Sequence, residues 1–137
     1  MAIDLSKIRW SWVVLGIVIA FVIAYGSSIV VVTGYATYLA FQAQGTPDIA
    51  MINEFAARYA GIITSIFFGV GTLVGGLLAG RKAKEDAFQN GLMVGAITAL
   101  LVLIVDVLGA LSLLTIVSVA LALGGGWLGG KLSSKRT

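Results

Sequence analysis

Four long apolar stretches alternate with short polar connections along the chain. They cover residues 12–41, 59–80, 88–105 and, after a turn near residues 108–110, 110–130, and the first runs for 30 positions without a charge. A transmembrane helix needs about 20 apolar residues, and a segment in lipid must satisfy its backbone hydrogen bonds internally. The period-two alternation of a membrane barrel is absent. The pattern therefore predicts an all-α integral membrane protein, one domain over residues 1–137, with four transmembrane helices forming two hairpins.

Residues 42–58 lie between the first two apolar stretches and predict an outward extension. Gln42–Gly45 is polar and ends the first helix, and Thr46-Pro47-Asp48 is typical of a helix start, with Thr46 as N-cap. Apolar residues then recur at steps of three and four. A continuous helix from Pro47 to Gly80 would have 34 residues and would raise the first hairpin about 15 Å above the membrane. The alternative is a helix that bends and lies on the lipid headgroups.

The second and fourth apolar stretches resemble each other when the chain is shifted by 50 residues. Gly75–Arg81 then falls on Gly125–Lys131, and at a shift of 79 Leu15-Gly16 falls on Val94-Gly95. The chain therefore reads as two helical hairpins in a parallel repeat. The difference between the two shifts assigns about 29 additional residues to the outer end of the first hairpin.

Glycine dominates the later stretches and recurs at four-residue spacing. Small residues let membrane helices approach closely, so a helix-packing role is predicted for Gly71, Gly75, Gly76, Gly80, Gly91, Gly95, Gly125, Gly126, Gly129 and Gly130. The second and fourth helices are expected to cross through Gly76/Gly80 and Gly126/Gly130. The alternative is a smooth groove for a lipid or pigment tail, or for a helix of another subunit, and no other cofactor is predicted.

Composition and charge support a membrane location. Hydrophobic residues make up 59% of the chain and charged residues 11%, against roughly 25% charged residues in soluble domains. Eight of the nine Lys and Arg residues lie at the termini or between the second and third stretches, with Arg58 on the other side. The positive-inside rule predicts a multi-pass protein of the inner membrane with both termini cytoplasmic. The sequence pI of about 9.5 then reflects this bias and attraction to anionic lipid, not nucleic-acid binding.

The chain offers little chemistry. It has no cysteine and no histidine, which excludes disulfides, thiolate chemistry and histidine-ligated metals, and no catalytic, metal or cofactor-binding residues are predicted. The protein is therefore not expected to be an enzyme. Asp106 interrupts an apolar stretch and is expected to be an interfacial turn acid or a helix cap. The alternative is a residue of a proton or ion path.

One segment resembles a known family. Gly75–Ala83 followed by Asn90–Gly95 is similar to the central hairpin, GG-x-x-AG-[RK], of an uncharacterised family of small four-helix bacterial membrane proteins. The resemblance covers about the last 80 residues, and the extension after the first helix departs from it. It implies four helices and no particular activity, and no site residue is carried over from it.

Two functions are compatible with these features. The first is a structural or accessory subunit of a larger membrane complex, docked through the apolar stripe Ile49, Ile52, Phe55 and Tyr59 of the extension. The second is a small self-associating channel or carrier for a small solute or ion. Small four-helix multidrug exporters are of similar size, but their essential glutamate has no counterpart between Trp12 and Phe41.

Overall fold

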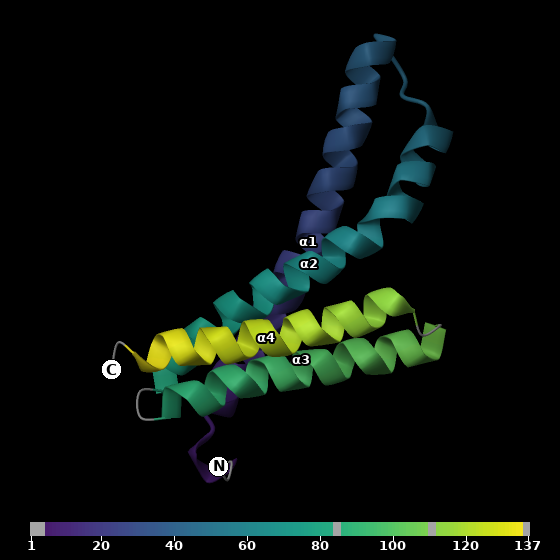
Figure 1. Ribbon diagram of the computed structural model, residues 1–137. Coiled ribbons are helices and arrows are strands. Elements are labelled where there is room, and N and C mark those ends of the chain that lie inside the picture. The colour runs from purple at the N-terminus through teal and green to yellow at the C-terminus, as the bar shows by residue number, and fades with distance from the viewer. Residues whose placement is uncertain (1–4, 84–85, 110–111, 136–137) are drawn as a thin grey trace.

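The computed structural model describes residues 5–83, 86–109 and 112–135. Within these ranges a 3-10 turn (Leu5–Lys7) precedes α1 (Trp10–Ala43), α2 (Ile49–Ala83), α3 (Ala87–Gly109) and α4 (Leu113–Ser134), with no strand among them (Figure 1). All four α-helices are long and apolar enough to cross a membrane. The prediction of an all-α protein with four helices suited to span a membrane is confirmed for the described residues.

The connection between α1 and α2 differs from the predicted one in its details. α1 ends where Gln44 adopts a left-handed conformation (φ 50°) and its N–H bonds back to carbonyl oxygens of the last turn. The N-cap of α2 is Asp48, not Thr46, because the Asp48 carboxylate accepts a hydrogen bond of 2.8 Å from the Ala50 N–H. The predicted start at Pro47 was therefore two residues early. α2 then runs unbroken to Ala83, which confirms a continuous helix, and Figure 1 shows it curving along its length.

The second pair of helices also has shifted boundaries. α3 continues through Asp106 to Gly109 instead of ending at residue 105. α4 begins at Leu113 behind a capping box, in which Ser112 Oγ accepts from the Thr115 N–H and Thr115 Oγ1 accepts from the Ser112 N–H. It extends to Ser134, beyond the predicted end at residue 130. The predicted start at residue 110 falls outside the described residues.

The start of α1, the end of α2, the start of α3 and the end of α4 lie at the same end of the molecule (Figure 1). The Arg9 N–H donates a 2.8 Å hydrogen bond to Asn90 Oδ1, which ties the start of α1 to the start of α3. The Lys82 ammonium lies 5.3 Å from the ring centroid of Trp12. We call this the basic end and the opposite one the far end. Six of the seven described basic residues, all but Arg58, lie toward the basic end: Lys7, Arg9, Arg81, Lys82, Lys131 and Lys135.

The first hairpin is longer than the second and leans away from it. Figure 1 shows the upper halves of α1 and α2 leaving the α3–α4 pair. Gly61 of α2 lies against Leu114 at the start of α4, so residues 49–60 of α2 continue past that level, about 18 Å along the helix axis. α1 runs antiparallel to α2, with Gly16 against Gly75 and Tyr35 against Phe55. In this register residues 31–43 of α1 lie alongside residues 49–60 of α2. We call residues 31–43 and 49–60 the protruding hairpin.

Candidate functional site

Glycines bring the backbones of α1 and α2 into contact near the basic end. A Cβ built on Gly75 would overlap the backbone of Gly16, and a Cβ on Gly71 would lie 2.7 Å from the carbonyl oxygen of Ala20. Since real Cβ atoms do not approach other atoms this closely, both positions require glycine for this helix spacing.

The same kind of contact joins α3 to α4. A Cβ on Gly91 would overlap Gly130, and a Cβ on Gly126 would lie 2.5 Å from the Cα of Gly95. Reciprocally, a Cβ on Gly95 would lie 2.7 Å from the Ala122 carbonyl oxygen. The two helices of the second hairpin are therefore held at backbone distance along two turns.

The crossing of α2 and α4 uses a different pair of glycines from the predicted one. A Cβ on Gly125 would overlap Gly69 and Thr72, and a Cβ on Gly129 would lie 2.5 Å from the Leu73 carbonyl oxygen. Gly126, in contrast, turns chiefly toward α3, although the edge of its backbone reaches α2.

The expected pairing of Gly76/Gly80 with Gly126/Gly130 is therefore right for Gly76, which lies against Gly126, and wrong for Gly80 and Gly130, which do not meet each other. Gly76 lies where three helices meet, its added Cβ 3.2 Å from the Gly91 oxygen and 3.3 Å from the Gly126 oxygen. Gly80 faces Ser133 and the backbone of Ala87, and Gly130 faces α3. α2, α3 and α4 therefore touch backbone to backbone around Gly76.

The predicted docking residues of the protruding hairpin divide into two groups. Ile49 and Tyr59 are 67% and 40% exposed. Ile52 and Phe55 are half-buried, and the Phe55 ring stacks on Tyr35 of α1 with 4.1 Å between centroids. Phe55 therefore holds the hairpin together instead of facing outward.

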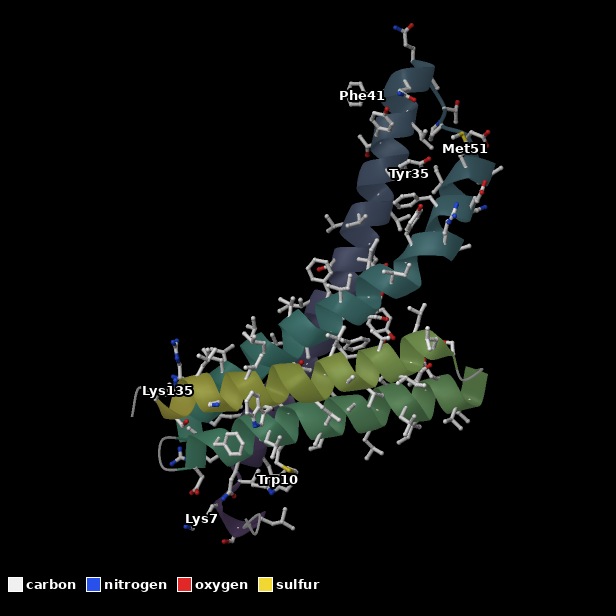
Figure 2. The ribbon with its side chains drawn as sticks, in the orientation of Figure 1. Lys7, Trp10, Tyr35, Phe41, Met51 and Lys135 are labelled. Carbon is white, nitrogen blue, oxygen red and sulfur yellow. The ribbon has the colours of Figure 1, made fainter. Side chains whose placement is uncertain are left out.

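The most exposed large apolar residue of the protruding hairpin was not among the predicted docking residues. Phe41, in the last turn of α1, is 81% exposed and lies near the tip (Figure 2). Its position at the end of the first apolar stretch, just before the polar turn, is the sequence signal that identifies it.

A cleft of about 410 Å³ opens at the far end, where the first hairpin leans away from the second. Its floor contains a 2.8 Å hydrogen bond between Ser118 Oγ of α4 and Ser65 Oγ of α2, both nearly buried. Phe21 and Phe68 also line it, and their rings pack edge to face with 5.2 Å between the ring centroids. It is lined by Phe21, Tyr25, Ser28, Ala60, Gly61, Thr64, Ser65, Phe68, Val102, Val105, Asp106, Ser112, Leu114 and Ser118. We call it the far-end cleft.

Asp106 lines this cleft from the last turn of α3. The helix continues to Gly109, so the expectation of a helix cap at Asp106 was wrong, while the expectation of an acid at the membrane interface stays a prediction. Its carboxylate has no hydrogen bond or ion pair with any residue of the described ranges. A negative charge near a helix C-terminus is also disfavoured by the helix dipole. Nothing in the local helix geometry therefore accounts for an acid at this position.

A second, almost wholly apolar groove of about 380 Å³ runs along the outside of the α2–α4 crossing. Its lining includes Gly69, Gly124 and Gly125 together with Ile66 and Leu128. Gly69 and Gly125 therefore line this groove and also take part in the contact between α2 and α4.

Within residues 5–83, 86–109 and 112–135, no group of three or more Asp or Glu side chains gathers as a metal site would require. No protein-family model, no curated protein and no solved structure matches the chain.

Proposed function

We propose that the protein is a structural or accessory subunit of a larger membrane complex, docked through its protruding hairpin. The observation that carries the proposal is the pair of exposed apolar side chains at the tip, Phe41 at 81% and Ile49 at 67% exposure. Both belong to the part of the first hairpin that continues past the start of α4.

The length of the second hairpin supports a position of this tip outside the hydrocarbon. α3 has 23 residues, or about 35 Å, which already crosses a core of about 30 Å. Exposed polar side chains on the protruding hairpin, among them Gln42, Asn53 and Glu54, fit the headgroup region or water. Apolar side chains in that setting gain about 1.5–3 kcal/mol each when a partner covers them.

The proposed orientation follows from charge. The basic end is assigned to the cytoplasm by the positive-inside rule, which places the protruding hairpin and the far-end cleft on the outer side of the inner membrane. Trp10 and Trp12 near the basic end and Tyr35 and Tyr59 toward the other fit the aromatic belts of two interfaces.

We also propose that the two hairpins arose by duplication. Gly16 meets Gly75 within the first hairpin, and Gly95 meets Gly126 within the second. The shift of 79 places Gly16 on Gly95, and the shift of 50 places Gly75 on Gly125, one residue before Gly126. The equivalent positions of the two hairpins thus make nearly the same contact, which supports a parallel repeat.

A small self-associating channel or carrier is the second candidate function, and the far-end cleft favours it. Because the glycine contacts close the centre of the single chain around Gly76, a channel would need its conducting path between copies. A carrier could instead use the cleft itself.

The test replaces Phe41 and Ile49 together by serine and measures what copurifies with the protein in mild detergent. These residues are exposed, so the change removes docking surface without removing the Tyr35–Phe55 stack. The matched control is Ile116→Ser, which is 67% exposed on the second hairpin. Loss of partner subunits in the double variant but not in the control supports the proposal. Undiminished copurification, or a sole homo-oligomer in the wild type, contradicts it.

A further inference from the structure

We propose that the far-end cleft binds a small organic cation, an ammonium group carried on an aryl or short alkyl body. The site combines one carboxylate, a set of hydroxyl groups and an aromatic floor in a single hollow between the two hairpins. It is separate from the tip residues of the protruding hairpin and does not rest on the accessory-subunit role.

The sign of the ligand's charge follows from Asp106. Among the described residues that line the cleft, Asp106 is the one charged side chain, and no Lys or Arg lines it. Arg58, the nearest basic residue along α2, lies with its guanidinium carbon 5.8 Å from the ring centroid of Tyr59 and lines a different cleft. Because the Asp106 carboxylate is half-buried and has no cationic partner among the described residues of the cleft, a cation is the favoured occupant and an anion is disfavoured.

The remaining polar groups suit an ammonium group better than a metal ion. Ca²⁺ and Mg²⁺ require several oxygen ligands at once, commonly more than one carboxylate, and the cleft supplies one. An ammonium group has three donors. Asp106 can accept one, and the hydroxyl oxygen of Thr64, which also lines the cleft, is a further acceptor.

Aromatic and aliphatic side chains define the body of the ligand. Tyr25 packs edge to face on Phe68 at 5.8 Å and stacks with Phe21 at 6.1 Å, which presents ring surface to the cleft. Ring faces attract cations and pack well against aryl groups. The volume of about 410 Å³ is near the lower limit of ligand pockets, about 300–1,000 Å³, and it matches a ring with a short chain rather than a peptide.

The experiment measures binding of benzylammonium to the full chain in nanodiscs of zwitterionic phosphatidylcholine by calorimetry. Benzyl alcohol, of nearly the same shape but uncharged, serves as the ligand control. Asp106→Asn removes the charge while keeping the shape, and Glu54→Gln is the matched protein control because Glu54 is exposed on the protruding hairpin outside the cleft.

Saturable binding of benzylammonium to the wild type is expected, with affinity at least about tenfold lower in Asp106→Asn and unchanged in Glu54→Gln. Benzyl alcohol should bind more weakly and equally to all three proteins. Thr64→Trp places an indole ring in the cleft while leaving Asp106 in the sequence, and should abolish binding of both compounds. Equal affinity of benzylammonium for wild type and Asp106→Asn, undiminished binding to a folded Thr64→Trp variant, or no saturable binding to the wild type overturns the proposal.

Discussion

Two neighbouring glycines of α4 allow the backbone contact between α2 and α4 to be tested with the same chemical change. Gly125 faces α2, where a Cβ would overlap the carbonyl oxygen of Gly69 and the hydroxyl of Thr72. Gly124, one position earlier, has no atom of another helix within 4 Å of an added Cβ. Alanine at Gly125 should therefore destabilise the protein, whereas alanine at Gly124 should not.

The magnitudes follow from opposite effects of one methyl group. At Gly124 the alanine improves helix propensity and restricts the unfolded chain, which is worth about 0.4–1 kcal/mol of stabilisation. At Gly125 the methyl group meets backbone that cannot rotate away, and such overpacking costs about 1–3 kcal/mol. The unfolding free energies of the two variants should differ by about 1.4–4 kcal/mol.

The assay is reversible unfolding in mixed micelles by titration with sodium dodecyl sulfate, followed by tryptophan fluorescence. The Gly124→Ala midpoint should equal or exceed that of the wild type, and the Gly125→Ala midpoint should fall clearly below both. Equal midpoints for Gly124→Ala and Gly125→Ala would refute the assignment of Gly125 to the helix contact.

Three further predictions concern other parts of the molecule. The Thr98 hydroxyl is fully buried and has no hydrogen-bond partner among the described residues, so Thr98→Val should leave the unfolding free energy unchanged or raise it; a loss above about 1 kcal/mol would show a hidden partner. Single cysteines at Asp48 and Lys82 should label from opposite sides of sealed cells with an impermeant thiol reagent, Asp48 from outside, and the same labelling at both would contradict the topology. Alanine at Tyr35 and Phe55, singly and together, should give a coupling energy of about 0.5–1.5 kcal/mol for their stack, and additive effects would argue against that contact.

The number and type of the helices could be predicted from the sequence because the membrane imposes them. A stretch such as residues 59–80 has few alternatives in lipid to a helix, and α2 spans it. Helix ends were less accurate: Thr46 and Asp48 both suit an N-cap, and the choice depends on which side chain reaches a free N–H once the turn has formed.

The contacts between helices could not be read with the same accuracy. Gly125 and Gly126 are adjacent, so each faces a direction about 100° from the other around α4. Spacing alone does not say which of the two contacts α2. In the structure Gly125 packs against α2, and Gly126 packs chiefly against α3.

The position of Asp106 illustrates a further limit. The pattern along the chain marks it as the end of a stretch, but the cleft that it lines forms because the first hairpin leans away from the second. That lean is a property of the whole fold and has no signature in the residues around Asp106.

The most direct test of the proposed role places a photocrosslinking amino acid at Phe41 and irradiates cells before their membranes are solubilised. Phe41 lies at the exposed tip of the protruding hairpin, and Leu100, exposed at 55% on α3, is the control position that faces lipid in the proposed arrangement. An accessory subunit should give a discrete adduct with a different membrane protein from Phe41 and none from Leu100. No protein adduct from Phe41, or an adduct only with a second copy of this chain, would contradict the account.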